Sequence, residues 1–194
     1  MKTMRSVVAG TVGAGKTTFV HTLSEIEVVN TDRPATDEAL LLKSETTVAL
    51  DFGRLILSPN MDLHIYGTPG QSRFDFMWDL LIQNAHNYIL LVPAHRPDNF
   101  QYSREILTFI NQRVQIPMLI GLTHTDCPGA VDSAEVMKML GYDSTDQDCP
   151  PIINVNPTER SSVIEALVIL MALVIERSNV KLFQTPYTKN KAPS

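Results

Sequence analysis

Short apolar runs alternate along the chain with stretches in which apolar residues recur every three or four positions. The apolar runs predict strands at 6–9, 87–92, 117–122 and 152–155, and a strand pair at 48–57 and 62–66 joined by a turn at 58–60. Helical spacing covers 18–23, 74–84, 99–113, 132–140 and 161–176. Gly53 interrupts its strand and is predicted to mark a β-bulge. This order predicts a three-layer α/β fold with a six-stranded, mostly parallel sheet and one antiparallel strand.

Length and charge narrow this picture only a little. The 194 residues suit one domain, predicted at 1–178, followed by a C-terminal tail at 179–194. With 19% charged residues and a net charge of −5, the chain gives no support to nucleic-acid binding or to a polybasic membrane anchor. The apolar run 166–175 is too short to cross a bilayer. Because the first residues lead directly into a strand and leave no room for a signal peptide, we expect a cytoplasmic location.

The segment Gly10–Thr17 (GTVGAGKT) fits the phosphate-binding loop pattern G-x-x-x-x-G-K-[ST] at every defined position, with a strand before it and a helix after it. Glycines let consecutive N–H groups turn toward an anion, and the helix start adds partial positive charge. Lys16 can reach the β- and γ-phosphates, and the Thr17 hydroxyl can ligate Mg²⁺. We therefore predict that a nucleoside triphosphate is bound by Gly10, Thr11, Val12, Gly13, Ala14, Gly15, Lys16, Thr17 and Thr18.

Two further segments are placed to respond to the γ-phosphate. The turn 67–71 follows a strand, so the N–H of Gly70 can bond a γ-phosphate oxygen and Gln71 can orient the attacking water. Thr47 precedes another strand and can offer its hydroxyl to Mg²⁺ and its N–H to the γ-phosphate, with Thr46 as the alternative. Pro-Gly is also a common turn pair and β-branched residues commonly begin strands, so each segment has a purely structural alternative.

Base recognition is predicted at 123–126, the run Thr123-His124-Thr125-Asp126 that follows a buried strand. The Asp126 carboxylate can accept hydrogen bonds from guanine N1–H and the 2-amino group together, a match that adenine lacks. A turn or helix-cap aspartate is the structural alternative. Asn156 and Pro157, after the last strand, are predicted to close a loop over the base.

These four pieces, in this order, resemble the Ras-like small GTPases over about residues 4–177. The resemblance is strongest to bacterial members, the MglA type and the conservon-encoded GTPases of actinobacteria, in the runs 46–53, 66–74 and 76–79. It implies a Ras-like G domain with two switch loops, GTP and GDP as ligands, and Mg²⁺ held at Thr17 and Thr47. It also implies GTPase-activating and effector proteins as partners, among them a roadblock-type dimer.

Three positions depart from the family pattern. Eukaryotic relatives carry an aspartate at the position of Gly67, where it holds Mg²⁺ through water, and the bacterial branch also lacks it. Asp62 begins its strand and so lies at the wrong end of the sheet to replace it. His124 stands where the family has a lysine whose stem packs on the base. The loop 156–158 matches neither the Ser-Ala-Lys nor the Asp-Ala-Arg of the family. Weaker Mg²⁺ and base binding are the expected consequences.

The sequence thus predicts a GTP-dependent molecular switch that hydrolyses GTP slowly. Water oriented by Gln71 would attack the γ-phosphate while Lys16 stabilises the developing charge. Arg33 and Arg73 are candidates for an arginine at the transition state, although each is otherwise a surface residue. Without such an arginine hydrolysis is slow, because it contributes about 10³–10⁵ in rate.

Two alternatives stay open. One is a module that binds nucleotide with little or no hydrolysis, which the departures at Gly67 and His124 suggest. The other is a P-loop kinase that transfers phosphate to a small molecule. A kinase of this type needs a lid rich in arginine, and residues 95–150 hold only Arg96, Arg104 and Arg113.

Overall fold

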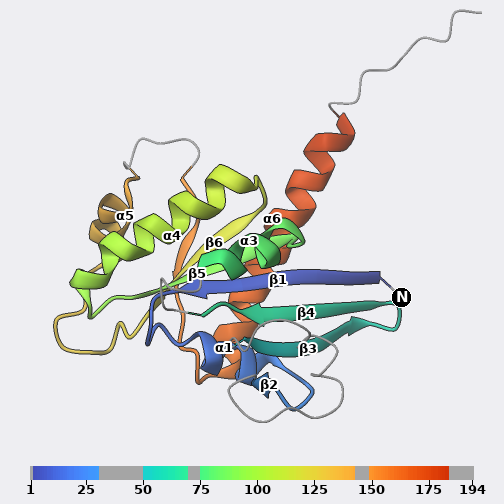
Figure 1. Ribbon diagram of the computed structural model, residues 1–194, viewed down its shortest axis with the longest axis horizontal. Coiled ribbons are helices and arrows are strands. Elements are labelled where there is room, and N and C mark those ends of the chain that lie inside the picture. Colours follow the sequence, from blue (N-terminus) through green and yellow to red (C-terminus); the bar gives the residue numbers. More distant parts are fainter. Residues whose placement is uncertain (1, 31–49, 70–74, 143–148, 184–194) are drawn as a thin grey trace, which may run out of the picture.

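A mixed sheet of seven strands forms the centre of the part of the chain that the computed structural model describes, residues 2–30, 50–69, 75–142 and 149–183 (Figure 1). The strands are β1 (Lys2–Gly10), β2 (Val29–Asn30), β3 (Asp51–Ser58), β4 (Met61–Gly67), β5 (Asn87–Pro93), β6 (Met118–Thr123) and β7 (Ile152–Asn154). Their order is β2-β3-β4-β1-β5-β6-β7, and β3 alone runs in the direction opposite to the other strands. The predicted α/β fold is confirmed, and the two-residue β2 extends the six predicted strands at one edge.

Helices cover both faces of the sheet (Figure 1). One face carries α1 (Lys16–Leu23) and α6 (Arg160–Phe183), and the other carries α3 (Asp75–Gln83), α4 (Phe100–Arg113) and α5 (Ser133–Leu140). Successive strand residues point to opposite faces, so on β1 Val8 packs with the first group while Val7 and Ala9 pack with the second. Both layers are therefore built on near-continuous apolar strands, as a sheet buried on two sides requires.

Gly53 does not mark a bulge, contrary to the sequence prediction. It pairs in register with Ile65, and the irregularity of the hairpin lies between Ile56 and Ser58. A Cβ at Gly53 would lie 2.9 Å from Cγ1 of Val20 on α1. The glycine is required because α1 approaches β3 closely at this point.

The helix ends follow the sequence in part. Asp132, the first residue of the predicted helix 132–140, caps α5 by accepting a hydrogen bond from the Glu135 N–H at 2.9 Å. Helix α6 continues to Phe183, past the predicted boundary at 178, and the division into domain and tail stays a prediction. None of the described helices is both long enough and apolar enough to pass through a membrane.

The carboxyl ends of several strands meet at one edge of the sheet. Gly10 at the end of β1 pairs with Leu91, and Pro93 at the end of β5 pairs with Thr123 at the end of β6. Strand β4 is parallel to β1 and ends beside it. Ligands of open α/β sheets bind beyond these ends, so this register brings the predicted site segments together.

Candidate functional site

The phosphate-loop sequence forms a tight turn between β1 and α1. Gly10, Gly13 and Gly15 have φ angles of 147°, 77° and 93°, which residues with side chains rarely adopt. A hydrogen bond from the Ala14 N–H to the Thr11 carbonyl, 3.2 Å long, closes the turn, and Gly15 is the N-cap of α1. Backbone N–H groups at such a helix start bind anions, so the loop has the form of a phosphate site.

Lys16 is buried beside this loop. Its Nζ donates a hydrogen bond of 2.7 Å to the Thr11 carbonyl. Burial lowers the pKa of Lys16 from 10.5 to about 8, and the carboxylate of Asp51 opposes part of that shift. Because an anion in the loop would favour the charged ammonium, anion binding and the protonation of Lys16 are coupled.

Asp51, a residue that the sequence analysis did not identify, supplies a carboxylate to this site. Its Oδ2 accepts a hydrogen bond of 2.6 Å from the Thr17 hydroxyl. Asp51 pairs with Gly67 across β3 and β4, and a Cβ at Gly67 would lie 3.1 Å from both Cβ and Oδ2 of Asp51. The glycine that departs from the family pattern therefore leaves room for a carboxylate from the neighbouring strand.

Asp62 lies at the other end of β4, as the sequence predicted. It pairs with Thr3 near the start of β1, and its Oδ2 accepts a 2.9 Å hydrogen bond from Nε of Arg54. This ion pair holds the hairpin at the end of the sheet remote from the phosphate loop, so Asp62 has no part in the site.

A pocket of about 610 Å³ opens next to the phosphate loop. Residues from the loop, from the segment after β6 and from the segment after β7 form its walls. The sequence-predicted residues in those walls are Gly15, Thr18, His124, Asp126, Asn156 and Pro157. The structure thus brings the predicted phosphate and base segments to one cavity.

Thr123 lies beneath this pocket rather than in its wall. The side chain is buried, and its hydroxyl donates a hydrogen bond of 3.1 Å to the Ala14 carbonyl. This bond ties the base-recognition segment to the phosphate loop. Thr123 therefore supports the phosphate loop, and the ligand contact that the sequence predicted for it stays a prediction.

His124 has an unusual backbone and a defined set of neighbours. Its φ of 56° is left-handed, and its Nδ1 lies 3.0 Å from the Thr123 hydroxyl oxygen. Burial, together with the neighbouring His95 and Arg96, lowers the pKa of His124 against the opposing effect of Asp126. The neutral imidazole is thus favoured in the pocket wall.

The segment 156–158 closes one side of the pocket with its own contacts. The Asn156 side-chain oxygen accepts hydrogen bonds from the N–H and the hydroxyl of Thr158, at 3.1 and 2.8 Å. The Thr22 hydroxyl donates to the Pro157 carbonyl at 2.7 Å, and Pro157 Cγ lies 2.7 Å from where a Cβ on Gly15 would be. Although its sequence departs from the family, this loop packs directly on the phosphate loop.

Several predicted site residues lie outside the described part of the chain. They are Thr46, Thr47, Gly70 and Gln71, with the arginine candidates Arg33 and Arg73. Their contacts to the γ-phosphate, to Mg²⁺ and to the attacking water stay predictions.

The oxygen donors around Thr17 suit a hard divalent cation. Its hydroxyl and the Asp51 carboxylate lie 2.6 Å apart, and oxygen ligands are those that Mg²⁺ prefers. Two further buried hydroxyls, of Thr11 and Thr68, have no hydrogen-bond partner among the described residues. Within the same residues no group of three or more His, Cys, Asp or Glu side chains could hold a metal by itself. A cation here would therefore need phosphate oxygens to complete its ligands.

Known proteins resemble this chain in sequence or in fold. A family model described as conserved hypothetical ATP binding protein matches residues 26–180. The uncharacterized protein MJ1339 of Methanocaldococcus jannaschii is 32% identical over 133 residues, which are 69% of this chain and 77% of that protein. The chain also resembles the Arl6 BBS3 small GTPase from Trypanosoma brucei, solved with the nucleotide analogue GppNp, with a TM-score of 0.69 and 16% identity over 90% of this chain and 99% of that one. The structural likeness shows a P-loop, small-GTPase fold, and together with the family it supports nucleotide binding.

Proposed function

The chain belongs to the family described as conserved hypothetical ATP binding protein, and we propose that it acts as a GTP/GDP molecular switch that hydrolyses GTP slowly. The γ-phosphate of GTP would order the segments around Thr47 and Gly70, and its loss would release them. A partner protein would then bind one of the two states.

The observation that carries this proposal is the continuity of one pocket from the phosphate loop to Asp126. Gly15 and Thr18 line one part of it and Asp126 another, as a nucleotide with its phosphates in the loop requires. The Asp126 carboxylate can accept from guanine N1–H and the 2-amino group, whereas adenine offers no such donor pair. The family description names ATP, so the choice of guanine rests on Asp126.

The chemistry would be water attack on the γ-phosphate. The Lys16 ammonium and the loop N–H groups would bind the phosphate oxygens and stabilise the charge that develops on them. Gln71 would orient the water. Thr17 and Thr47 would hold Mg²⁺, with Asp51 fixing the Thr17 hydroxyl, and the chemistry this ion would supply is neutralisation of phosphate charge.

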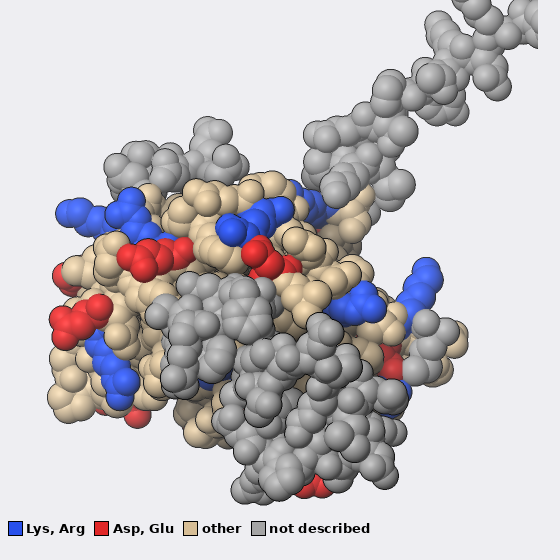
Figure 2. Space-filling model, viewed as in Figure 1, with Lys and Arg blue, Asp and Glu red and all other residues tan. Residues whose placement is uncertain are grey.

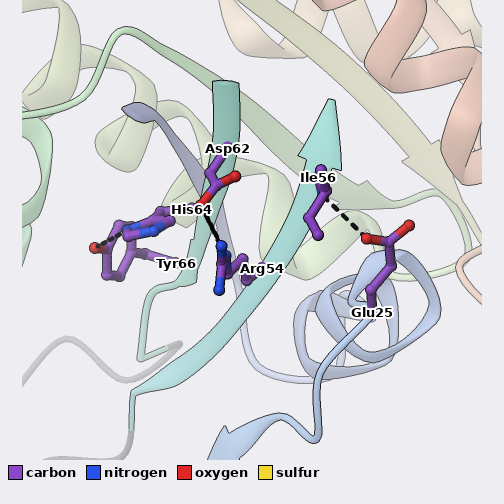
Figure 3. Close-up of polar contacts among 6 residues, drawn as sticks. All are labelled: Glu25, Arg54, Ile56, Asp62, His64 and Tyr66. Atoms are coloured by element: carbon purple, nitrogen blue, oxygen red, sulfur yellow. Dashed lines mark hydrogen bonds and ion pairs between the residues drawn. The ribbon is translucent and has the colours of Figure 1, made fainter. Parts of the chain in front are cut away.

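The surface of β3 and β4 that faces away from α1 is the proposed partner site. Phe52 contacts both His64 and Tyr66, with ring centroids 5.3 Å apart in each pair, and all three rings are partly exposed. Figure 3 shows His64 and Tyr66 together on β4, with the Arg54–Asp62 ion pair beside them. Aromatic residues are enriched in protein interfaces. Along the chain, β3 begins shortly after Thr47 and β4 ends shortly before Gly70. The state of those two segments would therefore decide whether an activating or effector protein binds.

The partner is a protein in this proposal, and a roadblock-type dimer is the form that the family resemblance implies. On the face shown in Figure 2, basic and acidic side chains are interspersed over the described residues rather than gathered by sign. Nucleic-acid binding sites are instead marked by a basic patch. Retention of a partner on GTP-loaded but not GDP-loaded protein in a pull-down would support the switch, and equal retention would contradict it.

Within the small GTPases we place the chain in the bacterial MglA-like and conservon-type branch, on the sequence runs 46–53, 66–74 and 76–79. Two of the three arginines between 95 and 150 lie away from the pocket, which weakens the kinase alternative because that alternative requires an arginine-rich lid. Arg113 forms an ion pair with Asp79 on α3, and Arg104 packs against Gly141 at the end of α5. Neither lines the pocket beside the phosphate loop.

Guanine selectivity tests the proposal directly. Labelled GDP bound to the purified protein should be displaced by excess GTP but not by ATP at the same concentration. Asp126→Asn should bind GTP much more weakly and should gain affinity for xanthosine triphosphate. The C2 carbonyl of that base can accept a hydrogen bond from the new side-chain amide. Glu165→Gln, which removes a carboxylate from the exposed side of α6, should keep the wild-type preference. Free displacement by ATP would reject the role given to Asp126.

Single-turnover hydrolysis separates a switch from a binding module. GTP bound to the wild-type protein should be converted slowly to GDP, and Gln71→Leu should slow the conversion further because water is no longer oriented. Tight GTP binding without any GDP formed, even with an activating partner present, would favour the binding module.

A further inference from the structure

Arg96 places a guanidinium against the phosphate loop. It follows β5, and its Nη1 lies 2.9 Å from where a Cβ on Gly13 would be. Gly13 adopts a positive φ of 77°, so both its backbone and its missing side chain allow this approach. The contact joins the edge of the phosphate loop to a cation from another segment of the chain.

The position of this guanidinium is set by its neighbours. Nε of Arg96 donates a hydrogen bond of 3.1 Å to Nε2 of His95, and the His95 ring lies 4.6 Å from the His124 ring between centroids. The Arg96 backbone is held as well, because its N–H donates to the Pro93 carbonyl at 3.1 Å and its carbonyl accepts from the Asn99 N–H at 3.0 Å. Arg96, His95 and His124 thus form a series of contacts from the phosphate loop to the wall of the base pocket.

No carboxylate neutralises this cation among the described residues. The two ion pairs found there use Arg54 with Asp62 and Arg113 with Asp79. Arg96 is exposed, and its side chain points to the loop and not to an acidic partner. A guanidinium presents a planar set of donors that matches phosphate oxygens two at a time. Its charge is therefore available to a phosphorylated ligand of the loop.

We propose that Arg96 is a nucleotide-contacting residue, a guanidinium supplied from within the chain that binds the phosphate tail of the nucleotide over Gly13. His95 is its positioning residue, since it accepts from Nε and leaves the terminal nitrogens free. The inference rests on the proposed function for the presence of a nucleotide, although it does not depend on the identity of the base. It gives the site a cation that the sequence analysis sought at Arg33 and Arg73.

The test compares affinities along a series of phosphates. Dissociation constants of GTP, GDP and GMP are measured for the wild type, Arg96→Ala and Arg96→Lys. Arg96→Ala should weaken the binding of GTP about tenfold or more, weaken that of GDP less and leave that of GMP almost unchanged. The lost hydrogen bonds are to charged phosphates, and hydrogen bonds to charged groups are the stronger ones. Arg96→Lys should fall between the two, since it keeps the charge without the paired donors. Equal GTP affinity in wild type and Arg96→Ala would overturn the proposal.

Further variants distinguish direct contact of Arg96 with the nucleotide from structural support of the phosphate loop. His95→Ala should reproduce part of the loss, and His95→Gln should retain more of the affinity because its side-chain oxygen can still accept from Nε. Arg104→Ala removes an arginine of α4 that lies against Gly141, and it should bind every nucleotide as the wild type does. An equal loss for GMP and GTP in Arg96→Ala would show that Arg96 only shapes the loop.

The same measurements with ATP and with inorganic triphosphate keep the two proposals apart. If the wild type binds ATP as well as GTP, guanine selectivity fails, while a tenfold effect of Arg96→Ala on ATP and triphosphate still supports the contact. If GTP is preferred but Arg96→Ala leaves all affinities unchanged, the contact fails alone. Absence of binding to all of these probes would overturn both.

Discussion

At the scale of single residues, the site depends on a carboxylate and a glycine that face each other across two strands. Asp51 extends into the space that a side chain at position 67 would fill, and from there it accepts a hydrogen bond from Thr17. The family resemblance implies that eukaryotic relatives carry an aspartate at position 67, on the adjacent strand. We therefore expect that a carboxylate can serve the site from either of these two neighbouring backbone positions.

Exchange of these two positions tests the idea. Asp51→Ala should weaken nucleotide binding in Mg²⁺ about tenfold or more, because a charge-assisted hydrogen bond to the Thr17 hydroxyl is lost. Binding in excess chelator should change less. Adding Gly67→Asp to Asp51→Ala should restore much of the Mg²⁺ effect, whereas Gly67→Asp alone should be harmful because it places two carboxylates together. Titrations of nucleotide with and without Mg²⁺ measure this, and a failure of the double variant to recover would contradict it.

Burial of Lys16 predicts a dependence of stability on pH. Its pKa of about 8 in the folded protein lies below the ordinary 10.5, so the unfolded chain binds more protons between these values. The free energy of unfolding of the nucleotide-free protein should therefore rise from pH 8 to pH 10.5, relative to Lys16→Met, by on the order of 3 kcal/mol. Below pH 8 the difference should be flat, since the lysine is charged in both states.

Denaturant unfolding at a series of pH values measures this contribution of Lys16. Lys138→Met, at an exposed position on α5, is the matched control and should follow the wild type. A parallel pH profile for Lys16→Met and wild type would contradict the prediction.

At the scale of elements, the phosphate loop is held in place by the packing of α1 on β3. Gly53 permits this contact, because Val20 of α1 and Ser24, which follows the helix, pack directly over it. The loop also receives the Thr123 hydroxyl from below and Pro157 from the side. Three segments from different parts of the chain therefore fix the loop before any ligand binds.

Gly53→Ala should separate the helix from the strand. The new methyl group would lie 2.9 Å from Cγ1 of Val20 and 3.0 Å from Cβ of Ser24, so we expect a loss of about 1–3 kcal/mol of unfolding free energy from overpacking. Because α1 carries the loop, nucleotide affinity should fall as well. Val20→Ala added to Gly53→Ala removes the nearest methyl group and should recover part of both. Thermal unfolding and nucleotide titration check this, and additive losses in the double variant would contradict it.

At the scale of the whole molecule, the nucleotide edge is coupled to the helices of the opposite layer. Trp78, the sole tryptophan of the sequence, is buried in α3 and donates a 3.3 Å hydrogen bond from Nε1 to the Pro69 carbonyl, next to the predicted γ-phosphate contact at Gly70. Its ring also packs edge-on against Phe109 of α4, with centroids 5.6 Å apart. A change in the turn would therefore alter a hydrogen bond made by this helical layer.

Trp78 should report the nucleotide state. Exchange of GDP for a non-hydrolysable GTP analogue is expected to change the intensity or wavelength of tryptophan emission, because the hydrogen bond to the turn is altered. Trp78→Phe abolishes the signal and supplies the baseline. Identical emission spectra in the two states would contradict a rearrangement of this turn.

The sequence alone was enough to predict the strands, the helices and the motifs that lie within single segments. The spacing of apolar residues predicted the strands and helices, since periods of about two and 3.6 are set by the backbone itself. The phosphate loop was equally clear, because all of its chemistry lies within eight consecutive residues, Gly10–Thr17. Asp126 and the segment 156–157 followed from the rule that strand ends meet at one edge.

Only the tertiary structure decided which residues distant in the sequence come into contact. A two-residue turn with Ser58 opposite Met61 would by itself place Asp51 opposite Thr68, and the irregularity between Ile56 and Ser58 moves it to Gly67. That one-residue shift gives Thr17 its carboxylate. Likewise, only packing between elements brings Arg96 to Gly13. The same is true of the approach of α1 to β3, which leaves room only for a glycine at position 53. Periodicity sets which residues share an element, but register and packing between elements set which side chains meet.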